Sequence, residues 1–375
     1  MKRTSIAMKV LLMLSAVLLV IPAHVIAQEK KTEEPRFKIG GFAHFDYYLG
    51  DNGSADTVSE QAFTVRRVRL SFSARITDQI SFTIVPQLDD AGTGERTGTL
   101  KDLFVNVKLH ELATVTAGLY KYEFDLEGRE SSTVRPFINR TVVTNTVAGR
   151  MTGEGGDFRD KGVSVIGKTG IGGGASLGYG LGVWQGIGPD RSDNNSDLGY
   201  TANLWVSPVK GLKLNGGYMT SDNTPKGTAL AATPTGTNNK YRAAVVGVQY
   251  DEGPIFARAE YFDAELKGSV TKIDRKGWYV EAAYSVLPKL DVMARYQEFE
   301  NETWGASDNK INSIDLGAKY YFAKKGRRSG TSIAVNYMIR DADSGVSTRI
   351  FDERGGTVTG SNIKNVFLAR LQVEL

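Results

Sequence analysis

Apolar and polar residues alternate with a period of two over most of this chain. In the stretch Arg66–Ile76 (RRVRLSFSARI), the even positions from 68 to 76 are apolar and the odd positions from 67 to 75 are arginine or serine. Such alternation predicts a β-strand with one apolar face and one wet face. About sixteen segments of 8 to 14 residues between 36 and 375 share the pattern, and no long stretch has a helical period. The pattern predicts an all-β protein.

The connections between these segments are alternately short and long. Seven short ones, such as Thr77–Gln79 and Leu287–Lys289, are interleaved with eight long ones, of which Glu123–Asp160 is the longest. An up-and-down antiparallel barrel with turns on one side of a membrane and loops on the other gives this order. In hydrocarbon a sheet must close, because every backbone N–H and C=O needs a partner. We therefore predict a transmembrane barrel of about sixteen strands over 36–375, with 123–160 as its third extracellular loop, and disfavour a soluble β-sandwich.

The first residues have the features of a secretory signal peptide. Lys2, Arg3 and Lys9 precede an apolar run, Val10–Ile21, that is too short to span a membrane as a helix, and small residues lead up to Ala27. We predict that residues 1–27 are a signal peptide and that 28–35 form a short periplasmic segment before the barrel. With the barrel, this indicates export to the cell outer membrane of a Gram-negative-type bacterium.

Charge and composition exclude several classes of function. The leader holds three of the 46 basic residues, which leaves 43 against 42 acidic ones, so bulk charge argues against nucleic-acid binding. The chain has no cysteine, which excludes thiolate and iron–sulfur chemistry and requires a large core or a closed sheet for stability. After the leader, His44 and His110 are the remaining histidines. We expect no metal site, no cofactor and no enzymatic activity.

Several blocks of sequence follow one another in a recognisable order. They are RRVRLSF from Arg66, LKDLFVNVKL from Leu100, VTAGLYKYEFDLEGRESS from Val115 and FRDKGVSVIGK from Phe158. In this order they resemble the phosphate-selective porin O/P family, and the resemblance runs from about residue 36 to 375. It implies a sixteen-stranded outer-membrane porin that assembles as a homotrimer. It also implies that the third extracellular loop folds into the barrel and narrows it.

If the apolar faces meet lipid, the alternate residues line a water-filled lumen. Arginines are solvated there, whereas on the lipid face each would cost about 2–4 kcal/mol near the midplane. The same phase places twelve basic residues in the lumen against eight acidic ones: Arg67, Arg69, Arg75, Lys38, Lys108, Lys168, Lys213, Arg258, Arg295, Lys319, Arg340 and Arg370. Rings of Arg or Lys favour anions, so we predict a mild anion preference. The alternative is a mixed-charge wall in which every arginine is paired with a carboxylate.

The long loop is expected to form the narrow zone. We predict that Arg129, Arg135 and Arg140 of the loop line this constriction, with Arg67 and Arg69 on the facing wall. Opposed charges across a constriction would orient small polar solutes. The alternative is that the loop is a surface lid whose charges are solvated.

Together these features predict a passive diffusion channel for small hydrophilic solutes. Its partners would be small anions, with phosphate as one candidate, and the outer-membrane lipid. The rival function is that of an adhesin or structural outer-membrane barrel whose loops bind a partner. The sequence leaves the solute open.

Overall fold

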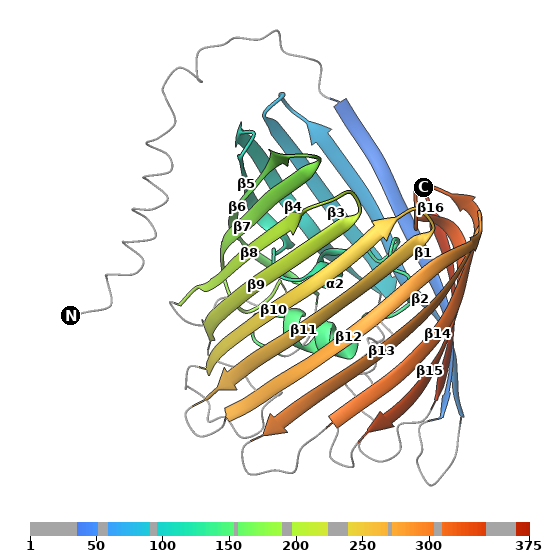
Figure 1. The fold of residues 1–375 in the computed structure, drawn as a ribbon. Coiled ribbons are helices and arrows are strands. Elements are labelled where there is room, and N and C mark those ends of the chain that lie inside the picture. Colours follow the sequence, from blue (N-terminus) through green and yellow to red (C-terminus); the bar gives the residue numbers. More distant parts are fainter. Residues whose placement is uncertain are drawn as a thin grey trace. The chain divides into compact units, whose positions relative to one another are not determined.

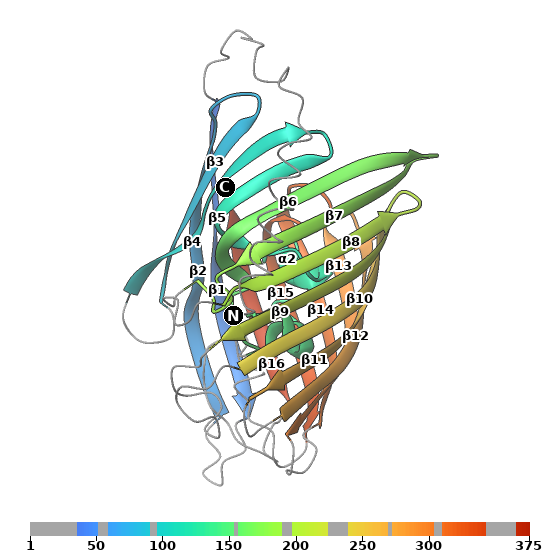
Figure 2. The ribbon, with the colours of Figure 1, turned by 90° about the vertical axis from the view of Figure 1, so that its left-hand side faces the viewer.

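The computed structural model describes residues 36–51, 59–90, 96–153, 157–189, 197–223, 239–268, 272–303, 310–342 and 365–375, so the predicted signal peptide and the segment 28–35 lie outside the described residues. Sixteen strands form one closed barrel (Figures 1 and 2). They are β1 (Arg36–Asp51), β2 (Ser59–Arg75), β3 (Ile80–Asp90), β4 (Arg96–His110), β5 (Ala113–Lys121), β6 (Arg159–Gly172), β7 (Ala175–Trp184), β8 (Gly199–Ser207), β9 (Leu212–Asn223), β10 (Asn239–Glu252), β11 (Ile255–Lys267), β12 (Lys272–Leu287), β13 (Leu290–Thr303), β14 (Lys310–Lys324), β15 (Gly330–Ala342) and β16 (Val366–Glu374).

Each strand pairs antiparallel with its neighbours in the chain, and β1 closes the sheet against β16. This last pairing runs from Phe42 opposite Glu374 to Gly50 opposite Val366. Closure gives both edges of every strand a partner, which a sheet in hydrocarbon requires. The predicted all-β, up-and-down barrel of sixteen strands is confirmed.

Several strands extend beyond the sequence pattern. The strands β1, β2, β4, β12 and β14 contain 15 to 17 residues, against the 8 to 14 predicted, and the others contain 9 to 14. As a result β11 and β12 take up most of the predicted loop Ala264–Arg275, and the loop after β5 spans 122–158, because Arg159 and Asp160 begin β6. Outside the hydrocarbon, side-chain hydropathy no longer has to alternate, so the sequence pattern stops there. The hydrogen-bond ladder continues beyond that point wherever a partner strand is present.

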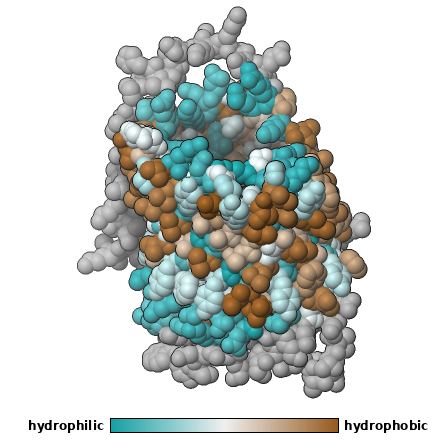
Figure 3. All heavy atoms as spheres, turned by 45° about the vertical axis from the view of Figure 1, so that its right-hand side comes forward, coloured by the Kyte–Doolittle hydropathy of each residue, from teal (hydrophilic) through white to brown (hydrophobic). Residues whose placement is uncertain are grey.

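The outer surface of the barrel is apolar in its middle zone. Along β10 the lumen-facing Tyr241 and Ala243 are buried, whereas Val246, in the opposite phase, is 61% exposed. Figure 3 shows, on one face, hydrophobic residues gathered in a band with hydrophilic residues above and below it. This distribution is that of a barrel whose belt meets lipid.

Part of the lumen is also apolar, which the sequence pattern did not predict. Lumen-facing residues of β10 and β11, among them Val245 and Phe262, join a buried cluster with Phe124, Val143 and Val147 of the loop after β5. The alternation assigned every inward position to water, and that assignment was wrong on this side of the barrel. The loop brings its own apolar residues to cover them.

Two short helical segments lie in the connection between β5 and β6. They are the helix α2 (Leu126–Arg129) and the π-helical turn η2 (Thr144–Ala148). In the described part of the chain, no helix has the length and apolar character needed to cross a membrane.

The lipid-facing position of Val246 on β10 predicts the effect of the substitution Val246→Arg. Val246 lies in the middle of β10, so an arginine there should lower the free energy of unfolding by about 2–4 kcal/mol. The measurement is urea unfolding of the protein in lipid vesicles. Val209→Arg is the matched control, because Val209 is 55% exposed in the turn between β8 and β9 and should tolerate the charge. Equal losses in the two variants would contradict the assigned lipid-facing phase.

Candidate constriction site

The loop between β5 and β6, residues 122–158, lies inside the barrel, where Figure 1 shows α2 behind the front strands. Its backbone is hydrogen-bonded to lumen-facing side chains of strands between β8 and β16. These bonds join Phe124 O to Asn203 Nδ2 (2.6 Å) and Asn215 Nδ2 (3.1 Å), Ile138 N to Asn336 Oδ1 (2.8 Å), Val142 N to Gln297 Oε1 (2.7 Å), Val147 O to the Tyr241 hydroxyl (2.7 Å) and Thr133 O to Gln372 Nε2 (3.1 Å). Buried backbone groups need such partners, so the loop crosses the lumen as an integral part of the fold.

Carboxylates hold the first turn of α2. The Asp125 side chain accepts a hydrogen bond from Gly128 N (2.6 Å), as an N-cap does. Glu260 of β11 accepts from Leu126 N (2.8 Å) and Glu127 N (3.1 Å). Burial raises the pKa of Asp125 to about 6. Two acids from distant parts of the chain therefore accept hydrogen bonds from the N–H groups of this turn that have no partner within the helix.

Cations hold the other end of α2. The Lys121 ammonium donates to the carbonyl oxygens of Gly128 (2.8 Å), Arg129 (3.2 Å) and Glu130 (2.6 Å). Arg140 Nη2 donates to the first and last of these carbonyls at 3.3 and 3.1 Å. Carbonyls at a helix C-terminus favour positive charge, so Lys121 and Arg140 are both placed by the loop's own backbone.

Ion pairs tie the loop to the β11–β14 side of the wall. Arg258 contacts Glu130 (2.9 Å) and Glu281 (2.5 Å), and Arg328, in the turn after β14, also contacts Glu130 (2.9 Å). Burial by itself would raise the pKa of Glu130, but the two guanidinium groups outweigh it and lower this pKa to about 2. Arg295 similarly pairs with Asp315 at 2.6 Å. On this side the arginines are matched by acids, as in the mixed-charge alternative.

On the β2–β6 side of the loop, basic side chains gather around Lys121. Around the Lys121 ammonium, four guanidinium groups lie within electrostatic range, those of Arg69, Arg135, Arg140 and Arg159. Arg159 binds both oxygens of Asp102 at 2.9 Å. Arg69 donates to the amide oxygen of Gln87 (2.5 Å), and its neighbour Arg67 is buried on the same face of β2.

A second acid, Asp157, lies beside this basic group. Its carboxylate contacts Lys101 at 3.1 Å and Arg159 at 3.4 Å. Burial would raise the pKa of Asp157, but these cations hold it well below its usual range. Asp102 and Asp157 therefore both pair with cations of this group.

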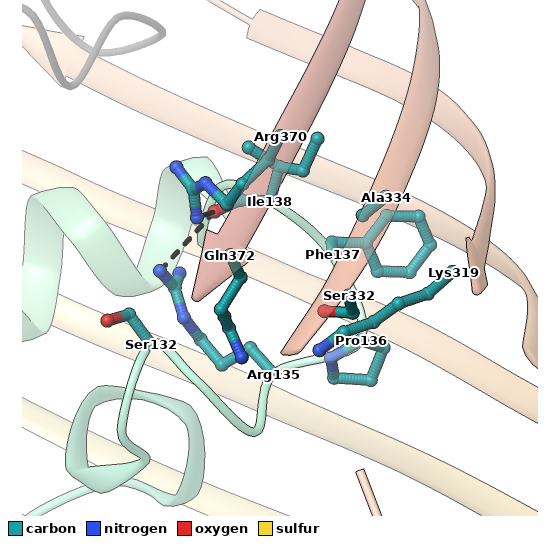
Figure 4. Close-up of a pocket in the computed structure, with 10 residues that line it drawn as sticks. All are labelled: Ser132, Arg135, Pro136, Phe137, Ile138, Lys319, Ser332, Ala334, Arg370 and Gln372. Atoms are coloured by element: carbon teal, nitrogen blue, oxygen red, sulfur yellow. Dashed lines mark hydrogen bonds between the residues drawn. The ribbon is translucent and has the colours of Figure 1, made fainter. Parts of the chain in front are cut away.

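A small cavity lies between the loop and the strands β14, β15 and β16 (Figure 4). Arg135 and Arg370 both donate to Ile138 O, at 3.4 and 2.9 Å, and Arg370 also binds both oxygens of Asp46 at 2.7 Å. Lys319, the third cation of the lining, donates to Thr133 O at 3.3 Å. Arg135 is only 2% exposed, and as a lining residue of this cavity it lies between the loop and these strands.

The remaining predicted residues are distributed along the barrel. Arg75, Lys38 and Lys108 are exposed at the end of the barrel that carries the short turns. Arg340 lies toward the long-loop end of β15, and Arg129 is ion-paired with Glu123. The ammonium groups of Lys168 and Lys213 lie over the ring of Trp205. The structure thus brings Arg69, Arg135 and Arg140 together around Lys121. The wall residues Arg258, Arg295, Lys319 and Arg370 contact the loop from the strands.

Sequence reasoning missed Lys121, Arg159 and Arg328. Lys121 and Arg159 border the long loop, at a strand end where the simple phase breaks down, and Gly118 near this point has a φ of +137°. Arg328 lies in the short turn between β14 and β15, for which the alternation pattern makes no prediction of partners. The dense charge of the segment 123–160 was the available signal for this region, but it did not indicate which partners would meet.

A closed sixteen-stranded barrel with an apolar belt and a loop across its lumen defines a transmembrane barrel of the porin class. The family model for phosphate-selective porin O and P matches residues 37–352, and the chain belongs to this family.

Solved structures with a similar fold agree with this class. An anion-selective porin from Comamonas acidovorans is 12% identical, with 91% of this chain and 100% of that chain covered and a TM-score of 0.66. Salmonella typhi OmpF in complex with daunomycin is 16% identical over 90% and 97% of the chains, with a TM-score of 0.64. In-vitro folded OmpT, an outer membrane protein of Vibrio cholerae, is 15% identical over 93% and 100%, with a TM-score of 0.61. No curated protein matches the chain significantly. Family and fold together make the protein an outer-membrane porin.

The Glu130 ion pairs predict how the loop responds to pH. Because the pKa of Glu130 falls from 4.5 to about 2 in the folded protein, its carboxylate stabilises the loop above about pH 4.5, and this contribution is lost as the pH falls toward 2. We expect Glu130→Gln to reduce the protection of loop amides at pH 7 by about 3 kcal/mol and to abolish its pH dependence in this window. Hydrogen–deuterium exchange of residues 126–142 measures both.

Glu265→Gln is the matched control for this prediction. Glu265 contacts Lys272 at 3.1 Å, but both side chains are substantially exposed, and such pairs contribute little. Protection unchanged in Glu130→Gln, or reduced equally in both variants, would contradict the assigned role of Glu130.

Proposed function

We propose that this porin is a passive diffusion channel for small hydrophilic solutes, that the loop 122–158 forms its constriction, and that the narrow zone favours small anions. The observation that carries the proposal is the gathering of basic side chains on the β2–β6 side of the loop. The guanidinium groups of Arg69, Arg135, Arg140 and Arg159 lie around Lys121. Asp102 and Asp157 contact Arg159.

The gathered positive charge affects which solutes can enter. Basic groups lining a narrow, low-dielectric passage raise the local concentration of anions and lower the barrier to their entry. The description of the family as phosphate-selective makes phosphate a candidate solute. The Comamonas acidovorans porin is anion-selective. It supports the proposed anion preference only through its similar fold.

The proposal assigns no chemical step to the lumen. His44 is buried, with Nε2 3.0 Å from Gln372 Oε1, whereas His110 accepts a hydrogen bond from Leu112 N in a turn. Neither contact is that of a base oriented toward a nucleophile. Export through the leader 1–27 and assembly as a homotrimer complete the proposal. A trimer form of Vibrio cholerae OmpT, which has the same fold, supports the latter.

The test is the reversal potential of the purified protein in a planar bilayer under a salt gradient. We expect stepwise conductance and an anion-directed potential. Arg67→Gln/Arg69→Gln should move the potential toward zero, because it removes two positive charges from the wall of the narrow zone. Lys240→Gln/Arg242→Gln removes the same charge from the outward phase of β10 and should leave the potential unchanged.

The possible results separate the parts of the proposal. A cation-directed potential, or equal effects of the two double variants, would refute the anion preference. Added phosphate that blocks the current would identify it as a solute, whereas a current insensitive to phosphate would leave a general anion porin. The absence of conductance steps would refute the channel and favour the adhesin.

A further inference from the structure

A tryptophan lies on the lumen face of the barrel between lysines of two other strands. In the register of the sheet, Lys168 of β6 is opposite Gly178 of β7, which is opposite Trp205 of β8. Trp205 is in turn opposite Asn215 of β9, and Lys213 is two residues before Asn215 on the same face. The face is the inner one, because the Asn215 side chain binds the loop at Phe124 O. Four adjacent strands thus contribute to one patch.

The indole lies against the wall, and the ammonium groups of both lysines lie over its ring. The Nζ atoms of Lys213 and Lys168 are 4.8 and 5.5 Å from the centroid of the Trp205 ring. A Cβ atom at Gly178 would be 2.1 Å from Cζ2 of the indole, so the glycine makes the room in which the ring lies. Any side chain at this position would push the ring off the wall.

The charge of this patch is only partly balanced. No described carboxylate comes within 4 Å of either ammonium, and the acids within electrostatic range of Lys213 are Glu123 and Glu260. Glu123 is paired with Arg129 of the loop. Glu260 accepts hydrogen bonds from the first turn of α2 and from the Tyr279 hydroxyl. Both acids are engaged elsewhere, and the two ammonium groups keep a surplus of positive charge.

The patch lies toward the short-turn end of the lumen. Trp205 is two residues before the end of β8 at Ser207, and Lys213 is the second residue of β9. A solute that has crossed the constriction from the long-loop side would meet it before leaving the barrel.

We propose that Trp205, Lys168 and Lys213 form a subsite for a small carboxylate that carries a planar ring, such as an aromatic carboxylate. The ring would stack on the indole, in the offset geometry that aromatic pairs prefer. The carboxylate would bind the two ammonium groups through charge-assisted hydrogen bonds. This inference rests on the proposed anion channel and adds to it a preference for ring-bearing anions.

The experiment uses the full-length protein in planar bilayers with three probes: benzoate, acetate and benzyl alcohol. We expect benzoate to reduce the chloride current at lower concentration than acetate does. Trp205→Leu should weaken the benzoate effect about fivefold, within the range measured for aromatic pairs, and leave the acetate effect unchanged. Lys168→Gln/Lys213→Gln should weaken benzoate and leave benzyl alcohol unchanged, and Trp205→Phe should restore most of the benzoate effect. Trp278→Leu, on the outer face of β12, is the control.

A second readout separates this proposal from the channel proposal. Titration of the detergent-solubilised protein with benzoate should change the indole fluorescence, and Trp205→Phe should remove this change even if no current is observed. Equal effects of benzoate and acetate, an unaltered benzoate effect in Trp205→Leu, or an effect of benzyl alcohol as strong as that of benzoate would overturn the subsite. A missing conductance or a cation-directed potential, with the fluorescence change intact, would instead overturn the channel or its anion preference.

Discussion

The pairing of β1 with β16 is the constraint on which the rest of the structure depends. Hydrocarbon contains no water to bond an open strand edge, so a sheet crosses a membrane only when it is closed. Closure also gives the sheet an inside and an outside. Once these exist, the phase of each strand decides which side chains meet lipid and which meet the lumen. The band of apolar residues and the polar interior are two results of one topological requirement.

The interior then has to accommodate a loop of 37 residues, 122–158, whose backbone cannot join the strand ladder. Amide, hydroxyl and carboxylate side chains of the wall supply the missing partners, as Asn203, Gln297 and Glu260 do. Apolar side chains such as Val143 and Phe262 fill the space between loop and wall. Packing and hydrogen bonding together hold the loop against one side of the barrel, as in the core of a soluble protein.

This placement sorts the charges of the lumen into two groups. Where the loop is attached, arginines and acids meet in pairs, because a buried charge without a partner is costly. Arg258 and Arg295 belong to this group, and their role is to fix the loop. On the other side Lys121 is held by carbonyl groups, which orient its ammonium but do not neutralise it. The lysines of the Trp205 patch are likewise oriented without being neutralised, because their ammonium groups contact an aromatic ring. Positive charge therefore gathers beside the loop and again near the short-turn end.

The sequence by itself determined the barrel, the number of strands and the lumen-facing phase of residues such as Arg67 and Arg258. The physical reason is that alternation and closure are set by neighbouring residues and by the medium, both of which can be read along the chain. Only the tertiary structure decided which partners these arginines would meet. Glu130 meets Arg328 and Arg258 across 198 and 128 positions of sequence, and Val143 packs on strands far along the chain. Such contacts depend on where the folded loop comes to rest, and no periodicity in the sequence encodes that position.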